Sequence, residues 1–187
     1  MLIARVKKES NIVEYVLYMY QIEDLIRSFQ FDLERIDREL VQSYEQTEKI
    51  KTEIKAWYSD LIEKMKSQNI QQEGHLQELN EVVEGIEVLH QSLLNTFQDK
   101  NHIRIYEEAQ EAIHELRQKT KAELRPSEVA VSINGLYGLL LLRLKNQAIA
   151  EETKNAMNSI SNLMANLAFQ YNQMKMGKLR FPEVQNN

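Results

Sequence analysis

The sequence predicts an all-α protein, a helical bundle of six or seven helices in a single domain. Two observations favour this class. Apolar residues recur at steps of three and four along most of the chain, the spacing that places them on one side of a helix. The 187 residues include only 5 Gly and 2 Pro, too few for the many turns of an all-β sandwich or barrel.

Helix-capping residues divide the chain into elements. Asn11 is placed to cap the first helix, Asp32 the second and Ser127 the fifth. A further break near residues 43–47 is only weakly indicated, so the sequence leaves open whether residues 32–68 form one helix or two. The domain is expected over residues 1–176 with a tail over 177–187, and its helices over residues 10–29, 32–68, 75–97, 101–123, 127–147 and 151–176.

The last two expected helices carry few charges. Residues 127–176 hold four Lys or Arg and three Asp or Glu, whereas residues 1–126 hold 17 and 24. Charged residues are depleted in cores and at the centres of interfaces. The final helical pair is therefore expected to be either more deeply buried than the others or part of an interface.

A stripe of neutral amides distinguishes the last helix. Its members follow one another at steps of three and four, where the other helices carry charges. A neutral polar stripe fits either a solvent-facing surface or an interface, and both interpretations stay open. The stripe comprises Asn155, Asn158, Asn162, Asn166 and Gln170, of which Asn158, Asn162 and Asn166 are the candidate interface residues.

The motif Glu-x-x-His occurs twice, at Glu87–His90 and at Glu111–His114. Two such motifs supply ligands in di-iron helical bundles, where all of them point inward. Glu111 and His114 lie off the apolar stripe of their helix, so we expect no metal site. His90 lies within an apolar stripe and is expected to be a hydrogen-bonded histidine of the core or its boundary.

Other patterns that carry chemistry are lacking in the sequence. The chain has 0 Cys, which excludes disulfides, thiolate metal sites and cysteine nucleophiles. No Ser or Thr is paired with a His by its spacing, and Gly135 and Gly138 lie inside an apolar helix instead of a phosphate-binding loop. We expect these glycines to allow close backbone contact with a neighbouring helix. We therefore predict no catalytic residue and no cofactor.

A cluster of tyrosines near the N-terminus offers a candidate ligand site. Tyr15 and Tyr18 precede Glu23 and Arg27, whose four-residue spacing favours an ion pair on a helix. These four residues suit a polar site beside a tyrosine-lined groove. They also suit a solvated helix face next to core aromatics, because surface ion pairs often contribute little.

Charge and hydropathy limit the kinds of partner that we expect the protein to bind. The formal net charge is -5 and no concentrated basic face is visible, so we expect no nucleic-acid partner. The longest apolar run, residues 135–142, is too short for a membrane span, and the first residues lack the apolar core of a signal peptide. A cytoplasmic location is the resulting expectation.

Two stretches carry a resemblance to a known family. The first is the opening Ile3-Ala4-Arg5-x-Lys7-Lys8-x-x-Asn11-Ile12-x-Glu14-Tyr15-x-Leu17-Tyr18-Met19-x-Gln21-x-Glu23-Asp24-Leu25-Ile26-Arg27, and the second runs from Leu140-Leu141-Leu142-Arg143-Leu144 to Glu152-Thr153-Lys154. Both resemble an uncharacterised bacterial family of similar length, a domain of unknown function. The resemblance extends over the whole chain and implies a bacterial, cytosolic, all-helical protein. It implies no activity, cofactor or catalytic residue.

Two functions follow as expectations. The first is a non-enzymatic cytosolic interaction or scaffold protein, a homo-oligomer or the binder of another protein, which self-associates through its low-charge C-terminal helices. The alternative is a small-ligand-binding or enzymatic helical bundle with a pocket near Tyr15, Tyr18, Glu23 and Arg27. Because helical bundles serve many functions, the fold class does not choose between them.

Overall fold

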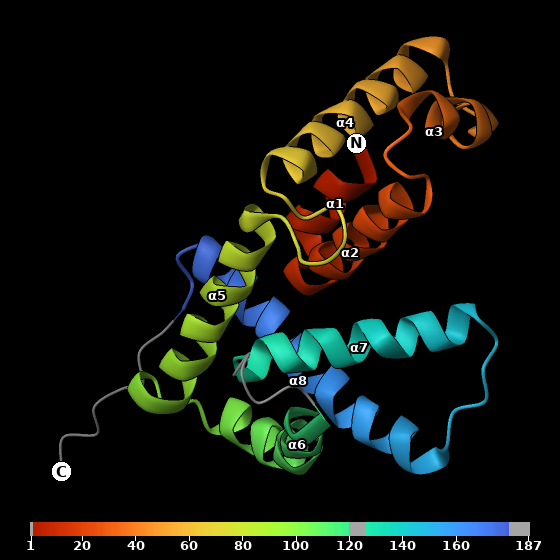
Figure 1. The fold of residues 1–187 in the computed structure, drawn as a ribbon. Coiled ribbons are helices and arrows are strands. Elements are labelled where there is room, and N and C mark those ends of the chain that lie inside the picture. Colours follow the sequence, from red (N-terminus) through yellow and green to blue (C-terminus); the bar gives the residue numbers. More distant parts are fainter. Residues whose placement is uncertain (1, 120–125, 180–187) are drawn as a thin grey trace, which may run out of the picture. The chain divides into compact units, whose positions relative to one another are not determined.

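A computed structural model describes residues 2–119 and 126–179 of the chain. Within these residues there are eight α-helices and no strand (Figure 1). The all-α class is thus confirmed, whereas the expected number of six or seven helices is too low. The expected helical residues 120–123 and most of the expected tail, residues 180–187, lie outside the described residues.

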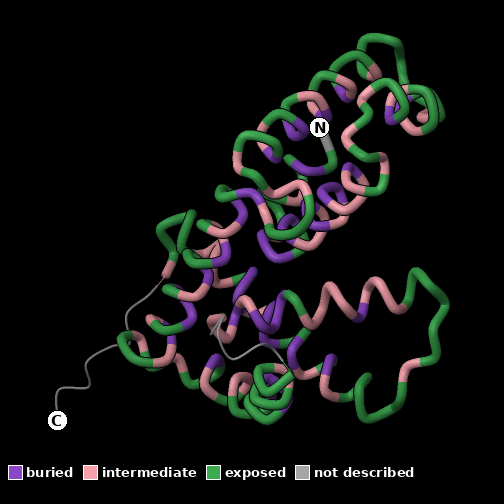
Figure 2. Tube along the Cα trace, in the orientation of Figure 1, coloured by how far each residue is buried: buried purple, intermediate pink, exposed green. Residues whose placement is uncertain are grey.

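The chain divides into two compact units. The N-terminal unit comprises Met1–Lys8 and Glu14–Glu81, and the C-terminal unit comprises Glu9–Val13 and Val82–Asn187. Each has its own buried apolar residues (Figure 2), which include Ile26 and Tyr58 in the first unit and Ile113 and Ile160 in the second. The single domain expected over residues 1–176 stays a prediction.

The chain begins with a helix that the apolar pattern did not indicate. This helix, α1 (Leu2–Ser10), has a buried Ala4, but its larger apolar side chains Ile3 and Val6 are about half exposed. The helix has only 9 residues, so the apolar spacing repeats too few times to predict it. The next helix, α2 (Ile12–Ser28), begins where expected, because the side chain of Asn11 accepts a hydrogen bond from the Val13 N–H.

The stretch expected over residues 32–68 forms two helices. Asp32 caps α3 (Leu33–Glu39), as predicted, and its side chain accepts a hydrogen bond from the Arg35 N–H. A 3-10 turn (Val41–Ser43) follows. Thr47 then caps α4 (Glu48–Ser67) through the Ile50 N–H. Two capping side chains thus separate helices that apolar spacing alone did not resolve.

The remaining helices lie wholly or mostly in the C-terminal unit. They are α5 (Gln77–Gln91), in which the boundary between the units falls, α6 (Lys100–Lys119), α7 (Glu128–Leu144) and α8 (Glu151–Lys175). A π-helical turn (Ser92–Thr96) follows α5 and ends the helix that was expected to run to residue 97. Helices α6, α7 and α8 pack against one another and form the core of this unit.

The two glycines of α7 differ in their surroundings. A Cβ atom added at Gly135 would lie 2.6 Å from Cδ1 of Leu116 on α6, so this glycine makes room for a side chain. A Cβ atom added at Gly138 would meet nothing within 4 Å. The expected close contact with a neighbouring helix is therefore present at Gly135, where α6 approaches through a side chain, and the expectation is wrong for Gly138, which faces open space.

Removing the cap of α7 provides a test of the helix boundary. The Ser127 hydroxyl accepts a hydrogen bond from the Ala130 N–H at 3.2 Å. Ser127→Ala leaves that N–H without its partner, so we expect the free energy of unfolding to fall by about 1 kcal/mol. Ser127→Asp keeps an acceptor and should unfold like the wild type in urea, monitored by circular dichroism. Equal losses in both variants would contradict the capping role.

Candidate functional site

The N-terminal unit contains a completely buried carboxylate, Glu23 on α2. Its Oε1 accepts a hydrogen bond from the Leu76 N–H at 2.9 Å, and its Oε2 lies 2.5 Å from Nδ1 of His75. Leu76 directly precedes α5, so the carboxylate binds at the positive end of that helix. A side chain of α2 thereby helps to determine where α5 begins.

His75 connects this carboxylate to an aromatic ring. Its imidazole stacks on Tyr20 with the ring centroids 3.4 Å apart and the planes 10° from parallel. The His75 side chain is 26% exposed, so part of the ring reaches solvent. Burial raises the pKa of Tyr20, with a further contribution from Glu23, so its phenol stays neutral at physiological pH.

Arg27 binds the loop that leads to His75. Its guanidinium donates to Oδ1 of Asp24 at 2.8 Å, to the carbonyl of Ile70 at 3.1 Å and to the carbonyl of Gly74. The ion pair expected between Glu23 and Arg27 is therefore wrong: Arg27 pairs with Asp24, and Glu23 with His75. Both residues make structural hydrogen bonds that hold the loop against α2.

The two tyrosines of the predicted ligand site have different neighbours. Burial raises the pKa of Tyr15, and Glu78 is the second cause. Burial also raises the pKa of Tyr18, to about 12, and there the second cause is Tyr44. A helical step of 100° places Tyr18 on a different side of α2 from Glu23. The ligand site predicted from these residues stays a prediction, and the structure divides its members between two environments.

The sequence missed the contact between Glu23 and His75. The two residues are 52 positions apart, and helical periodicity relates only residues within a few turns of each other. A partial signal existed, because Glu23 lies close to the apolar stripe of its helix. A carboxylate near a core stripe needs a partner, but the sequence does not identify which residue supplies it.

A second polar cluster lies in the core of the C-terminal unit. His90 on α5 and His102 on α6 are both buried, and Nδ1 of His90 lies 2.9 Å from Nε2 of His102. The other nitrogen of His102, Nδ1, lies 2.8 Å from the amide nitrogen of Asn166 on α8. His90 is thus a hydrogen-bonded core histidine, as predicted. The sequence did not indicate its partners, which come from other helices.

At its other end, this series of polar side chains reaches α7. Nε2 of His90 is 3.6 Å from Oε2 of Glu128, and neither atom has a hydrogen-bond partner. The Tyr106 ring meets the His90 ring edge-on, with the ring centroids 5.0 Å apart, and burial with the nearby Glu128 raises the pKa of Tyr106 to about 12. The histidine chain therefore comprises Asn166, His102, His90 and Glu128, and it contains one residue from each of four helices.

Burial determines the protonation of the two imidazoles. Desolvation, with a smaller contribution from the neighbouring His90 and against the opposing charge of Asp99, lowers the pKa of His102 to about 4. Desolvation also lowers the pKa of His90, against the opposing charges of Glu87 and Glu128. Both rings are accordingly neutral at physiological pH, although carboxylates lie nearby.

The two Glu-x-x-His motifs do not converge. Glu87 accepts a hydrogen bond from the Val129 N–H at the start of α7, while Glu111 and His114 are exposed on α6. Across residues 2–119 and 126–179, no group of three or more His, Cys, Asp or Glu is arranged to hold a metal ion. The first motif instead connects α5 to α7 through Glu87 and to His102 through His90.

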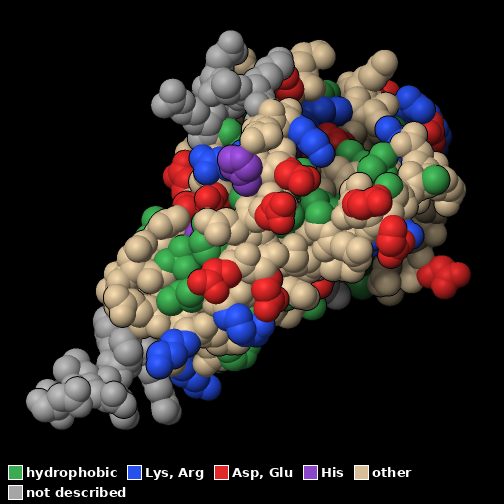
Figure 3. All heavy atoms as spheres, turned by 90° about the horizontal axis from the view of Figure 1, so that it is seen from below, with side chains coloured by type: hydrophobic (Ala, Val, Ile, Leu, Met, Phe, Trp, Pro, Cys, Tyr) green, Lys and Arg blue, Asp and Glu red, His purple; other side chains and the backbone are tan. Residues whose placement is uncertain are grey.

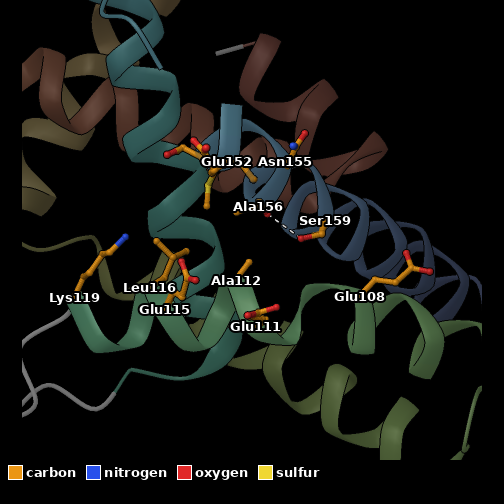
Figure 4. A pocket seen from close by; sticks show the side chains of 12 residues that line it. Glu108, Glu111, Ala112, Glu115, Leu116, Lys119, Glu152, Asn155, Ala156 and Ser159 are labelled. Atoms are coloured by element: carbon orange, nitrogen blue, oxygen red, sulfur yellow. Dashed lines mark hydrogen bonds between the residues drawn. The ribbon is translucent and has the colours of Figure 1, made fainter. Parts of the chain in front are cut away.

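A pocket of about 540 Å³ lies between α6 and α8 (Figure 4). Its volume falls in the range of small-molecule sites. The walls combine the carboxylates of Glu108, Glu111, Glu115 and Glu152 with apolar side chains such as Leu116 and Met157. Carboxylates of this density attract cations and repel anions. The pocket belongs to the C-terminal unit, whereas the pocket expected from the sequence adjoined the N-terminal tyrosines.

The exposed side of α8 carries no charge over most of its length. No charged residue occurs between Lys154 and Lys175. Asn166 lies apart from the other expected interface residues, because it is half-buried and bonded to His102. Phe169, by contrast, is 58% exposed. We call the exposed side the amide face; it comprises Asn155, Asn158, Asn162, Ala165 and Phe169.

These features define an all-helical protein with buried polar connections between helices and a neutral exposed face on its last helix. No helix in the described part of the chain is long and apolar enough to cross a membrane. On the face shown in Figure 3, basic side chains are interspersed with acidic and neutral ones. The expected absence of a nucleic-acid partner stays a prediction.

Comparison with known proteins identifies the family. A family described as a domain of unknown function, DUF4924, matches residues 1–178. The chain belongs to this family. No curated protein and no solved structure matches it. The family resemblance expected from the opening residues is thus confirmed, and it assigns no activity.

Removing the buried carboxylate tests its structural role. Glu23→Ala leaves the Leu76 N–H and the His75 ring without their partner in a buried site, so we expect a loss of about 3 kcal/mol in unfolding free energy. Trp57, the single tryptophan, lies on α4 of the same unit and reports urea unfolding by fluorescence. The exposed Glu81→Ala is the matched control and should change stability by less than about 0.5 kcal/mol. A similarly small effect of Glu23→Ala would refute the role.

The neutral histidines predict a pH-dependent stability. The pKa of His102 is lower in the folded than in the unfolded chain, so its contribution is complete above about pH 6.5 and is lost as the pH falls toward 4. We expect about 2 kcal/mol less stability at pH 5 than at pH 7. Urea unfolding followed by circular dichroism measures the difference. His102→Gln should reduce it, and an unchanged pH dependence in that variant would contradict the assignment.

Proposed function

We propose that the protein is a non-enzymatic interaction protein that self-associates through the amide face of α8. The observation that carries this proposal is the long uncharged stretch of an exposed helix, with Phe169 58% exposed at one end. Surface helices normally carry charges on the side that faces water. Neutral polar residues around an exposed aromatic side chain are instead typical of the centre of an interface.

A second copy of the chain suits this face better than an unrelated partner of either charge. An asparagine side chain both donates and accepts hydrogen bonds, so the same residue can pair with itself across a two-fold axis. A carboxylate or an ammonium group would meet its own charge there. The chain has a net charge of -5, so two copies repel each other wherever acidic surfaces meet. The amide face avoids that repulsion.

The neighbouring helix supports the proposal. α7 packs against α8, and its C-terminal half keeps several apolar side chains only partly covered. Leu140 and Leu141 are half-buried, and Leu144 is 64% exposed. These partly covered apolar side chains of α7 would add to the area that association removes from water. Both low-charge helices thus contribute to the proposed surface. From the family resemblance, we propose that the protein acts in the bacterial cytosol.

The alternative of a ligand-binding or enzymatic bundle has weaker support. Its charged candidates, Glu23 and Arg27, already bind His75, Leu76, Asp24 and two loop carbonyls. Groups engaged in this way must break structural hydrogen bonds before they bind a ligand. A shift in melting temperature on addition of a small molecule, absent in Arg27→Ala, would favour the alternative.

Charges placed on the amide face should prevent association. The double variant Asn158→Glu/Asn162→Glu puts four new carboxylates into a two-fold interface, and facing like charges cost several kcal/mol. We expect the dissociation constant to rise at least about 10-fold. Light scattering coupled to size exclusion should show an assembly larger than the 22.0 kDa chain for the wild type and a smaller mass for the variant.

The control adds the same charges elsewhere. Gln72→Glu/Asn101→Glu changes two exposed amides outside α8 and should assemble like the wild type. Asn166 is left unchanged in both variants, because it bonds to His102 and its loss would disturb the core. A wild-type chain that stays monomeric at high concentration, or a double variant that still assembles, would refute the proposal.

A further inference from the structure

His102 is the link between the core of the C-terminal unit and α8. One ring nitrogen lies 2.9 Å from His90, and the other lies 2.8 Å from the amide nitrogen of Asn166. Asn166 is one helical turn beyond Asn162, which belongs to the amide face. Together with the buried apolar side chains of α8, this hydrogen bond from the core therefore holds the part of the helix that carries Asn162.

In the histidine chain, each hydrogen bond is donated in the direction that leads from Asn166 toward Glu128. The amide of Asn166 donates to Nδ1 of His102, so the ring proton of His102 must be on Nε2 and is donated to Nδ1 of His90. The proton of His90 is then on Nε2, which faces Glu128. A further proton on His102 would set its N–H against the N–H of Asn166. Turning the Asn166 amide would restore that bond, but it would leave the charge in a completely buried site.

The groups around His102 come from every helix that packs against it. α5 supplies His90, whose own charged neighbours are Glu87 and Glu128, and Asp99 precedes the first turn of α6. α8 supplies only the neutral Asn166 amide. Asp99 favours a charged ring, but burial, which is the largest effect, and His90 both oppose it. A protonated His102 is therefore accommodated only when the ring gains access to water.

We infer that protonation of His102 displaces α8 and thereby releases the self-association, so that the protein is assembled at neutral pH and dissociated in acid. This inference rests on the proposed function, because it concerns the regulation of the same face. The imidazole acts by positioning α8: the neutral ring accepts the hydrogen bond from Asn166, and the charged ring does not. Assembly in turn favours the neutral ring.

The experiment compares association at pH 7.5 and pH 5 by sedimentation velocity. If the pKa of His102 rises from about 4 to its ordinary value of about 6.5 on release, the dissociation constant at pH 5 rises up to about 30-fold for each protomer. His102→Gln keeps a donor and an acceptor without titrating, so its association should be the same at both pH values. His114→Gln removes an exposed histidine and should respond to acid like the wild type.

The outcomes separate the two proposals. A wild-type chain that is monomeric at pH 7.5 refutes the proposed function and this inference with it. Equal association of the wild type at both pH values refutes only the inference, as does a His102→Gln variant that dissociates in acid like the wild type. Should that variant fail to fold, NMR titration of the His102 ring supplies the test. Its pKa should be higher in the Asn158→Glu/Asn162→Glu monomer than in the assembly, and equal values would overturn the inference.

Discussion

The two hydrogen bonds of the His102 ring are the interaction on which the C-terminal unit depends. An imidazole is one of the few side chains that can accept on one side and donate on the other while it stays uncharged. Between α5, α6 and α8 it therefore satisfies two polar groups at once, the buried His90 and the half-buried Asn166. A carboxylate or an ammonium group at this place would carry a charge into a completely buried site, at a much higher cost.

In the N-terminal unit, Glu23 also satisfies polar groups of other segments from a buried position, but it is an acidic side chain instead of a neutral imidazole. It is a potential charge in a buried site, and it is accommodated because its two oxygens face the Leu76 N–H and the His75 ring. Both clusters thus connect helices that are distant in sequence. Apolar packing brings such helices together without selecting one register, whereas a buried polar group is satisfied in few arrangements.

What the sequence could predict follows from the range of its signals. Caps act within one helical turn, so Asn11, Asp32 and Ser127 were recognised from the chain alone. Apolar spacing identified α2 and α4 to α8 but missed α1, which has only 9 residues. The bonds from Glu23 to His75 and from His102 to Asn166 join residues 52 and 64 positions apart, and no local pattern relates such residues. The sequence also treated Asn162 and Asn166 alike, although one is exposed and the other turns into the core.

The difference between these two asparagines connects the core to the surface. They lie one turn apart on α8, so a shift of this part of the helix that separates Asn166 from His102 also moves Asn162. In the proposed self-association, burial of the amide face is then coupled to the protonation of the buried His102 ring. By linkage the coupling is reciprocal: if a proton on His102 weakens association, association must lower the proton affinity of His102 by the same factor. In the proposed mechanism, the neutral His102 ring therefore keeps α8 in the position in which the amide face can associate.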